Sequence, residues 1–429
     1  MFSPWRSIFC SSTSCCALWT SPIGLWVLST FVQTFYSHWY GSLWSGSCGV
    51  YWPLDFTSPF LYSHASCLII PVHVDDGLAI TNSRPLYQWF VEELSHDLEV
   101  VDLGAASLYL GMHITRDRPH RKLWILQKPA IVDLLETWNL LDCTPQKVPL
   151  PHRLDSLKPC QPNSCADIAD HEIEISYQRI VGSLTYLSIC TRPDISYATL
   201  ALSQYNANPS RTQLLAAKGV LRYLAGTQDY GLEYSISPSA LPTTVIPHMS
   251  ACALSDADWA SDTSDRKSVS GYAFFCFGSL VSWSSSRQKV VAASSTDSEY
   301  YAMSNAVREA LWIRLFLTIN HFPVPKPFPL FSDNQSAITI ANKPNHVNSS
   351  RSKHIDVRYH FIRERIDDGT FETIWLPTAD MTADIFTKPL PVPSFEKHRA
   401  ALGIVPVLWT YYFFVLLSYY RPSGGVLDY

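Results

Sequence analysis

The chain has 429 residues, enough for two or three domains with cores of their own. It is 47% hydrophobic and 16% charged, and its net charge of −5 excludes a uniformly basic nucleic-acid binder while leaving room for a local basic groove. Eleven cysteines form no Cys-x-x-Cys pair and are odd in number, so we expect reduced thiols in an intracellular protein rather than a disulfide framework.

Residues 1–54 differ from the rest of the chain. They contain six Trp and one formally charged residue, Arg6, without a clear period of 2 or 3.6. A secretory signal would need an unbroken apolar stretch after Arg6, and Ser and Thr interrupt the run from Ile8 to Leu18. We therefore leave this segment unassigned and do not expect secretion.

The first clear pattern lies between Cys67 and Ile80, where two apolar runs flank Asp75-Asp76-Gly77. This spacing predicts a β-hairpin with an acidic tip. Such a tip is an ordinary solvated turn or, in a polymerase palm, a pair of magnesium ligands. The next predicted elements are a helix over Trp89–Leu98, a strand over Tyr109–Met112 and an amphipathic helix over Pro129–Leu141.

Two proline-rich stretches divide the remainder. Pro145–Cys165 contains five prolines and reads as a linker, and Ser237–Pro247 reads as a second one. Between them the pattern predicts helices over Tyr177–Ile189 and Gln213–Ala225, the latter ending at a glycine. The second linker marks the residues beyond Pro247 as a separate domain.

That last region alternates predicted strands and helices. A strand leads into Asp256, and Gly278-Ser279 is typical of a hairpin turn. The further predicted elements are a helix over Asp297–Thr318, a strand over Pro329–Ser332, helices over Ser336–Ala341 and His354–Ile366, a strand over Phe371–Leu376 and a helix from Thr382. This order predicts a mixed sheet with helices on its faces.

This region contains four acidic residues of interest, Asp256, Glu299, Asp333 and Asp384. Carboxylates that converge repel one another and need a cation, and magnesium prefers oxygen ligands. Each position also has a simpler interpretation: a turn residue for Asp256, a capping-box glutamate for Glu299, an N-cap for Asp333 and a helix-dipole partner for Asp384. Asp258 and Asp297 are second choices.

The same region resembles the ribonuclease H domain of copia-type (Ty/copia) LTR retrotransposon polyproteins. The resemblance covers roughly residues 55–400, and many motifs occur in the family's order. They are Asp256-Ala-Asp-Trp-Ala260, Asp265-Arg-Lys-Ser-Val-Ser-Gly-Tyr272, Ser295-Thr-Asp-Ser-Glu-Tyr300, Glu309-Ala-Leu-Trp312, Asp333-Asn-Gln-Ser-Ala337, Lys353-His-Ile-Asp-Val-Arg358, His360-Phe-Ile-Arg-Glu364 and Ala383-Asp-Ile-Phe-Thr-Lys-Pro-Leu390, with Val181-Gly-Ser-Leu-Thr-Tyr186, Thr191-Arg-Pro-Asp194 and Leu221-Arg-Tyr-Leu224 upstream.

The resemblance implies an α/β (α+β) fold, a ribonuclease H-like mixed five-stranded sheet with helices on both faces, preceded by a truncated reverse transcriptase palm, thumb and connection. It also implies that Asp256, Glu299, Asp333 and Asp384 are catalytic and bind two Mg²⁺ ions, for which Mn²⁺ could substitute. Water would then attack the RNA strand of an RNA–DNA hybrid, so no Ser or Cys nucleophile and no small-molecule cofactor are expected.

A basic stretch runs from Lys343 to Arg365, with six Lys or Arg residues against two acids. Within it we select Arg351, Lys353, His354 and Arg358 as candidates for contact with hybrid phosphates. A solvated helix face explains the same residues equally well.

The family pattern fails near the N-terminus. No Asp or Glu precedes Asp55, His73 stands where the family has Tyr, and Pro71 interrupts a strand that should be central. We therefore expect a reverse transcriptase remnant, with Asp75 and Asp76 at its hairpin, and no polymerase activity. A non-catalytic retroelement remnant that binds nucleic acid or a partner is the alternative for the whole chain.

These observations divide the chain into five segments. They are an unassigned apolar segment over 1–54, a truncated palm and thumb over 55–150, connection helices over 151–237, a ribonuclease H-like domain over 238–400 and an apolar tail over 401–429. Leu402–Tyr420 is uncharged and close to the ~20 residues that span a bilayer, so a tail anchor and a run of sequence beyond the domain both stay open. We expect an intracellular protein, cytoplasmic and particle-associated or nuclear, with the hybrid and other polyprotein parts as partners and no membrane partner.

Overall fold

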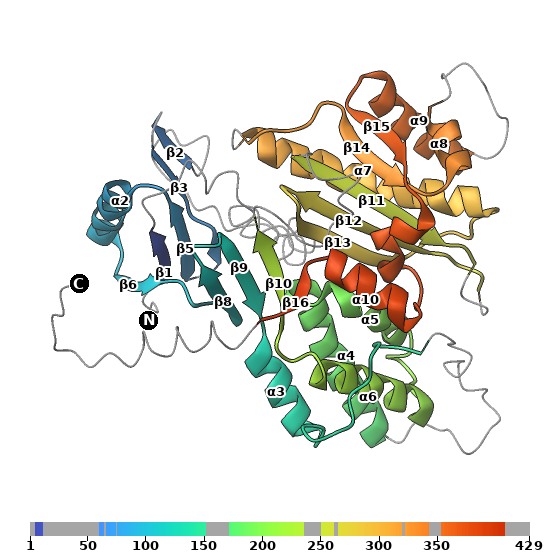
Figure 1. The fold of residues 1–429 in the computed structure, drawn as a ribbon, viewed down its shortest axis with the longest axis horizontal. Helices are drawn as coiled ribbons and strands as arrows, with labels where there is room; N and C mark the ends of the chain where they lie inside the picture. Colours follow the sequence, from blue (N-terminus) through green and yellow to red (C-terminus); the bar gives the residue numbers. More distant parts are fainter. Residues whose placement is uncertain are drawn as a thin grey trace.

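The computed structural model describes residues 5–11, 60–63, 66–73, 75–151, 171–235, 250–260, 265–319, 322–342 and 353–407. Over these residues the chain forms three β-sheets and a group of helices (Figure 1). The fold is mixed α/β, as predicted from the sequence.

The first sheet has the strand order β2-β3-β5-β1-β6, with β4 beside β5. Its strands are β1 Trp5–Ser11, β2 Phe60–Ser63, β3 Ser66–Ile69, β4 Val72–His73, β5 Asp76–Thr81 and β6 Val100–Ala105. β4 and β5 pair antiparallel, with His73 opposite Asp76, which confirms the predicted hairpin. Helix α2, Arg84–Asp97, packs against β3 and β5 and begins where the Ser83 hydroxyl accepts a hydrogen bond from the Leu86 amide.

The second sheet joins three distant parts of the chain in the order β16-β10-β9-β8-β7. Its strands are β7 Leu108–Tyr109, β8 Met112–Asp117, β9 Lys122–Leu126, β10 Tyr230–Ser235 and β16 Ile404–Pro406. The prediction of one strand over Tyr109–Met112 is wrong, because Leu110 and Gly111 both have positive φ and turn the chain between β7 and β8. Helix α3, Lys128–Thr137, follows β9.

A helical layer packs against the third sheet (Figure 1). Its elements are α4 His171–Cys190, the 3₁₀ turn η2 Pro193–Ile195, α5 Ser196–Ser203 and α6 Arg211–Ala225. α4 and α6 contain the two helices predicted from the sequence. α6 begins with a capping box in which the Gln213 side chain accepts from the Ser210 amide, and Gly226 is its C-cap.

The third sheet has five strands in the order β13-β12-β11-β14-β15, which confirms the predicted mixed sheet. Its strands are β11 Ala251–Asp258, β12 Val269–Cys276, β13 Ser279–Arg287, β14 Phe328–Ser332 and β15 Phe371–Trp375. β11, β12 and β13 pair antiparallel, whereas β14 runs parallel to both β11 and β15. We call this sheet and its helices the mixed-sheet region.

Helices cover both faces of this sheet, as predicted (Figure 1). Alternate residues of β11 explain why: Ala251 and Ala253 pack into the core beneath α7, whereas Cys252 and Leu254 pack into the core on the opposite face. The covering elements are α7 Ser295–Ile319, α8 Gln335–Ala341 and α9 Lys353–Asp367, and, on the opposite face, η4 Thr382–Phe386 and α10 Val392–Ala401, with η3 Thr378–Asp380 between β15 and η4.

The chain after Thr382 differs from its prediction. A single helix is not formed, because Pro389 and Pro391 cannot donate helical hydrogen bonds and separate η4 from α10. Part of the segment assigned to an apolar tail forms β16, which pairs with β10. The rest of Leu402–Tyr420 beyond Val407 lies outside the described residues. No helix within the described ranges is long and apolar enough to span a membrane.

The helical layer and the mixed-sheet region share one hydrophobic core. Side chains of α4, α5 and α6 pack with those of β12, β13, η4 and α10 in a single buried cluster. The indole N–H of Trp283 in β13 donates to the backbone oxygen of Ser188 in α4, 2.9 Å away. Besides η4 and α10, residues that precede the second predicted linker therefore also cover the second face of the mixed sheet.

Candidate metal centre

Asp256 lies inside β11 and is only 2% exposed. It is therefore a strand residue and not the turn residue of the simpler interpretation. Its partner across the sheet is Gly271 in β12. The Thr387 hydroxyl donates a hydrogen bond to Asp256 Oδ2, which orients the carboxylate.

Glu299 lies in the first turns of α7, and its side chain is buried. It does not cap this helix, because the Ser294 hydroxyl accepts from the Asp297 amide and Asp297 accepts from the Ala293 amide. The Gln288 amide group donates to Ser298 O and Ser270 Oγ, each at 2.9 Å, and so joins this end of α7 to the sheet. Asp297 is thus a capping residue, and Glu299 is free to turn inward.

Asp333 directly follows β14 and precedes α8. The N-cap of α8 is Asn334, whose side chain accepts from the Ala337 amide at 2.9 Å, so Asp333 does not serve as the cap. Instead, the Thr378 hydroxyl donates to Asp333 Oδ2 at 2.7 Å. This contact holds the carboxylate at the end of the parallel strands β11 and β14.

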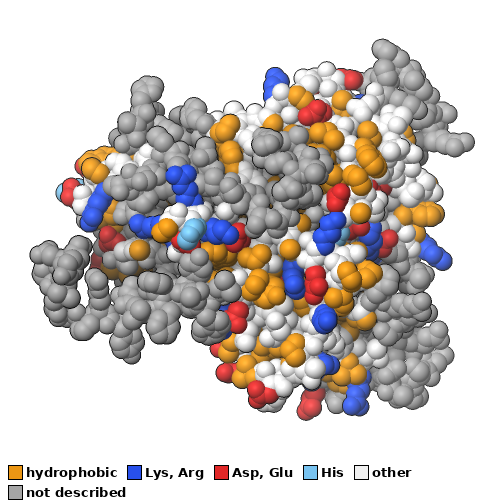
Figure 2. All heavy atoms as spheres, in the orientation of Figure 1, with side chains coloured by type: hydrophobic (Ala, Val, Ile, Leu, Met, Phe, Trp, Pro, Cys, Tyr) orange, Lys and Arg blue, Asp and Glu red, His pale blue; other side chains and the backbone are white. Residues whose placement is uncertain are grey.

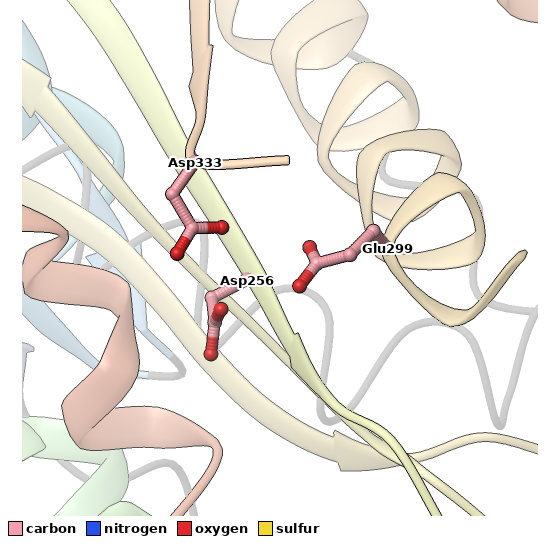
Figure 3. Close-up of side chains that lie close together, drawn as sticks. All are labelled: Asp256, Glu299 and Asp333. Carbon is pink, nitrogen blue, oxygen red and sulfur yellow. The ribbon is translucent and has the colours of Figure 1, made fainter. Parts of the chain in front are cut away.

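These three carboxylates turn toward one another from a strand, a helix and a strand end (Figure 3). One ligand oxygen from each of Asp256, Glu299 and Asp333 lies within 4.8 Å of the other two. Within the described residues, Glu299 Oε2 is buried without a hydrogen-bond partner. Three carboxylates, one of which has an unsatisfied oxygen, suit a hard divalent cation. We call Asp256, Glu299, Asp333 and the neighbouring Asp384 the acidic cluster.

Asp384 joins this cluster from η4 and contacts a cation of the chain itself. Lys388 Nζ lies 3.0 Å from Asp384 Oδ1 and 3.9 Å from Asp256 Oδ2. η4 can approach the sheet because of Gly271: a Cβ there would lie 2.7 Å from the Phe386 Cβ. Asp384 therefore lies against Lys388 and Asp256, not in the group of three.

The electrostatics of the cluster follow from burial of like charges. Burial, together with the charges of Asp256 and Asp333, raises the pKa of Glu299 well above its ordinary value. Burial and the charge of Asp256 raise the pKa of Asp384 to about 8, against the opposing charge of Lys388. Burial also raises the pKa of Asp256, which Lys388 and Thr387 oppose. Burial lowers the pKa of Lys388, but the two aspartates outweigh it and raise the net value.

Sequence comparison finds relatives among the Pol polyproteins of transposons. A scan against protein-family models finds no match. The chain is 35% identical over 343 residues to the retrovirus-related Pol polyprotein from transposon TNT 1-94 of Nicotiana tabacum, covering 80% of this chain and 25% of the relative. It is 35% identical over 353 residues to the corresponding polyprotein from transposon RE1 of Arabidopsis thaliana, covering 82% and 23%.

A shorter relative is covered over most of its length. The chain is 32% identical over 247 residues to a putative transposon Ty5-1 protein of Saccharomyces cerevisiae, covering 56% of this chain and 73% of that protein. The chain belongs to the copia-type retrotransposon Pol polyproteins. It spans about a quarter of the length of the two plant polyproteins.

Solved structures give only a weak likeness. One is LC11-RNase H1 in complex with RNA/DNA hybrid, 11% identical with a TM-score of 0.25, over 32% of this chain and 93% of that one. Another is RNase H1 from Halobacterium salinarum, 15% identical with a TM-score of 0.23, over 32% and 93%. Such TM-scores do not establish a shared function.

The other residues singled out from the copia-type resemblance are not part of the acidic cluster as the described residues define it. Asp75 is at the turn between β4 and β5, and Asp76 is the first residue of β5. Arg351 lies outside the described residues. Lys353, His354 and Arg358 are in α9, whose first residues are described as backbone only. Their proposed contact with phosphates stays a prediction.

Sequence reasoning missed three residues of the site. Thr378 and Thr387 donate to Asp333 and Asp256, and Lys388 pairs with Asp384. Thr387 and Lys388 stand inside the quoted motif Ala383–Leu390, so their position three and four residues after Asp384 was available as a signal. Thr378 lies in a turn that no periodicity marks, and only the folded chain brings it to Asp333.

Proposed function

We propose that this chain is a ribonuclease H that hydrolyses the RNA strand of RNA–DNA hybrids with two divalent cations, Mg²⁺ in the first place and Mn²⁺ as a substitute. The observation that carries the proposal is the meeting of Asp256, Glu299 and Asp333 within 4.8 Å in a largely buried position. Like charges held so closely are tolerated when a cation binds among them. Membership of the copia-type Pol polyproteins supports the choice of substrate.

Bound divalent cations would activate water and stabilise the leaving 3′ oxygen of the RNA. Asp256 would serve both cations, and its position supports this role: it lies near Glu299 and Asp333 on one side and near Asp384 and Lys388 on the other. Thr387 and Thr378 keep two of the carboxylates in place through their hydroxyl groups. The nucleophile is water, so the site needs no Ser or Cys nucleophile.

We also propose that the chain lacks RNA-directed DNA polymerase activity. Among the described residues, the one group of three or more metal-ligating side chains is Asp256, Glu299 and Asp333. Among those described residues, the hairpin carboxylates Asp75 and Asp76 belong to no such group. Two carboxylates at a hairpin tip do not make a two-cation polymerase site.

The wider assignments are proposals as well. They are the RNA–DNA hybrid and other Pol polyprotein parts as partners, an intracellular placement in cytoplasmic particles or in the nucleus, and the five segments defined from the sequence. Helices α4 and α5 share a core with the mixed sheet, so residues before 238 help to cover one face of that sheet. A fragment without them would expose this face. Tests should therefore use the full chain.

The test measures cleavage of a hybrid with a labelled RNA strand by the full-length chain, with and without Mg²⁺. We expect Mg²⁺-dependent cutting of the RNA strand, lost in Asp333→Asn and kept in the control Asp142→Asn, which alters an exposed carboxylate outside the site. A folded chain that binds the hybrid and never cuts it would support the alternative of a non-catalytic remnant. Equal cutting by wild type and Asp333→Asn would contradict the assignment of the site.

A further inference from the structure

Lys388 places an ammonium group inside the acidic cluster. Its Nζ is 3.0 Å from Asp384 Oδ1 and 3.9 Å from Asp256 Oδ2, and its side chain is 31% exposed. A cation at these distances from two largely buried carboxylates interacts with them more strongly than a surface lysine would. Lys388 thus already neutralises part of the charge that the cluster collects.

The arrangement contains two places where positive charge is favoured. One is enclosed by the oxygens of Asp256, Glu299 and Asp333. The other lies between Asp256 and Asp384, and there the Lys388 ammonium group is found. Asp256 borders both places, so a cation in either one affects the other through this carboxylate.

The backbone that carries Lys388 is anchored from several sides. The Ser285 hydroxyl in β13 donates to Phe386 O at 2.6 Å, and the Thr387 hydroxyl lies 3.2 Å from Asp384 O in addition to its bond to Asp256. Pro389 and Leu390, which come directly after Lys388, line a small cavity with Leu150 and Phe395. The position of the ammonium group therefore results from a packed backbone as well as from its charge.

We propose that Lys388 is a positioning residue that serves as the built-in counter-ion of this site. Its ammonium group holds Asp384 and Asp256 in place and leaves their oxygens when a divalent cation binds between them. The inference rests on the proposed function, since it takes the cluster to be a divalent-cation site. It has two consequences: without Lys388 the metal-free fold is less stable, and a divalent cation binds more tightly because no internal cation competes for the same oxygens.

The test compares full-length wild type with Lys388→Met, and uses Lys397→Met as the matched control. Lys397 also pairs with an aspartate, Asp380 at 2.8 Å, but lies outside the cluster. Titration calorimetry with Mn²⁺ is expected to show about tenfold tighter binding in Lys388→Met, wild-type binding in Lys397→Met, and near wild-type binding in Lys388→Arg, which keeps the charge. Lys388→Met should unfold at a lower temperature without cations, and saturating Mn²⁺ should close most of that gap.

A purely structural lysine behaves differently. Its loss would lower the unfolding temperature equally with and without Mn²⁺ and leave the affinity unchanged or weaker, and either result overturns the proposal. If Lys388→Met does not fold without cations, the double variant Asp384→Asn with Lys388→Met, which removes both charges, is expected to fold and to exceed the single variant in stability. A double variant no more stable than the single one overturns the proposal too.

Hybrid cleavage measured on the same samples distinguishes a failure of the proposed ribonuclease H function from a failure of the counter-ion role of Lys388. Mn²⁺ binding that tightens in Lys388→Met, without any cleavage by the wild type, would remove the proposed function and support the counter-ion role. Cleavage by the wild type with unchanged Mn²⁺ affinity in Lys388→Met would remove the counter-ion role and leave the function. Absence of Mn²⁺ binding in every variant would contradict both.

Discussion

Two clusters of buried charge in this chain differ in how far their charges are neutralised by the chain itself. In the helical layer, the fully buried guanidinium of Arg192 donates to both carboxylate oxygens of Asp194, at 3.0 and 2.8 Å, and to Thr227 O and Oγ1. The Tyr223 hydroxyl donates to Asp194 Oδ2 at 2.5 Å. Both charges of this pair are therefore neutralised and hydrogen-bonded within the chain.

The acidic cluster, in contrast, contains four carboxylates and a single ammonium group, that of Lys388, which pairs with Asp384 and lies 3.9 Å from Asp256. On the face drawn in Figure 2, Lys, Arg and acidic side chains are scattered among uncharged ones, whereas Asp256, Glu299 and Asp384 are buried. Burial and mutual repulsion raise the pKa of Asp256, Glu299 and Asp384, and one oxygen of Glu299 stays without a hydrogen bond in the described structure. Burial of charge alone therefore does not distinguish a functional site from a structural one. The excess of negative charge does distinguish them, because it adds no stability to the fold unless a cation binds.

The largest effect is expected from Asp256→Asn. Removing one charge from the crowded cluster should stabilise the metal-free fold and reduce hybrid cleavage by about a thousandfold, since Asp256 borders both cation positions. Urea unfolding in EDTA and cleavage rates in Mg²⁺ measure the two quantities on the same protein. Loss of stability together with retained cleavage would mean that Asp256 is a structural residue.

Asp194→Asn is expected to act in the opposite sense. It leaves the buried Arg192 guanidinium without its counter-charge and should lower the free energy of unfolding by about 3 kcal/mol. Asp142→Asn, at an exposed position, should change it by no more than about 0.5 kcal/mol. Urea unfolding followed by circular dichroism checks both. Equal stability of the two variants would show that the Arg192–Asp194 pair is energetically neutral.

Gly271→Ala tests the acidic cluster by displacing η4, the element that carries Asp384. The new Cβ would lie 2.7 Å from Phe386 Cβ and 2.8 Å from Thr387 Cγ2, so η4 must shift away from β12. We expect a loss of about 2 kcal/mol in stability and weaker Mn²⁺ binding. Gly182→Ala in α4, where nothing lies within 4 Å of the added Cβ, is the control and should be neutral or slightly stabilising. Unchanged Mn²⁺ binding in Gly271→Ala would separate η4 from the cation site.

The smallest effect concerns acid pH. Burial would raise the pKa of Asp194, but the charge and hydrogen bonds of Arg192 outweigh it and hold that pKa below its ordinary value. A lowered pKa stabilises the fold above the unfolded-state value of about 3.9, and this contribution is lost as the pH falls through the folded-state pKa. Wild type should therefore lose more stability than Asp194→Asn below about pH 4, in urea unfolding at about pH 3 and about pH 6. Parallel losses in the two proteins would contradict the pairing.

The mixed-sheet region could be predicted from the sequence because its signals are local. The apolar run of β11 that leads into Asp256, the Gly278-Ser279 turn and the long apolar stripe of α7 specify strands and a helix within short windows. In the predicted order of elements, Asp256 and Asp333 come at the ends of strands and Glu299 at the start of a helix. The folded chain gathers these three side chains within 4.8 Å.

The rest of the fold depends on contacts that no local pattern reveals. β10 pairs with β9, so that Leu232 lies opposite Ile125, and β16 pairs with β10 from the far end of the chain. The quoted motif Thr191–Asp194 carried no sign that its Arg and Asp would be fully buried. Lys388 likewise reads as a surface lysine until the approach of η4 to β12 places it against Asp384.

The central claim is that the acidic cluster is a divalent-cation site, and the most direct test is calorimetric titration of the full-length chain with Mn²⁺ in the absence of nucleic acid. We expect wild type to bind Mn²⁺ and Asp256→Asn to lose most of that affinity while staying folded. A wild-type chain that binds no Mn²⁺, or an Asp256→Asn variant that binds it equally well, would show that the acidic cluster is not a divalent-cation site.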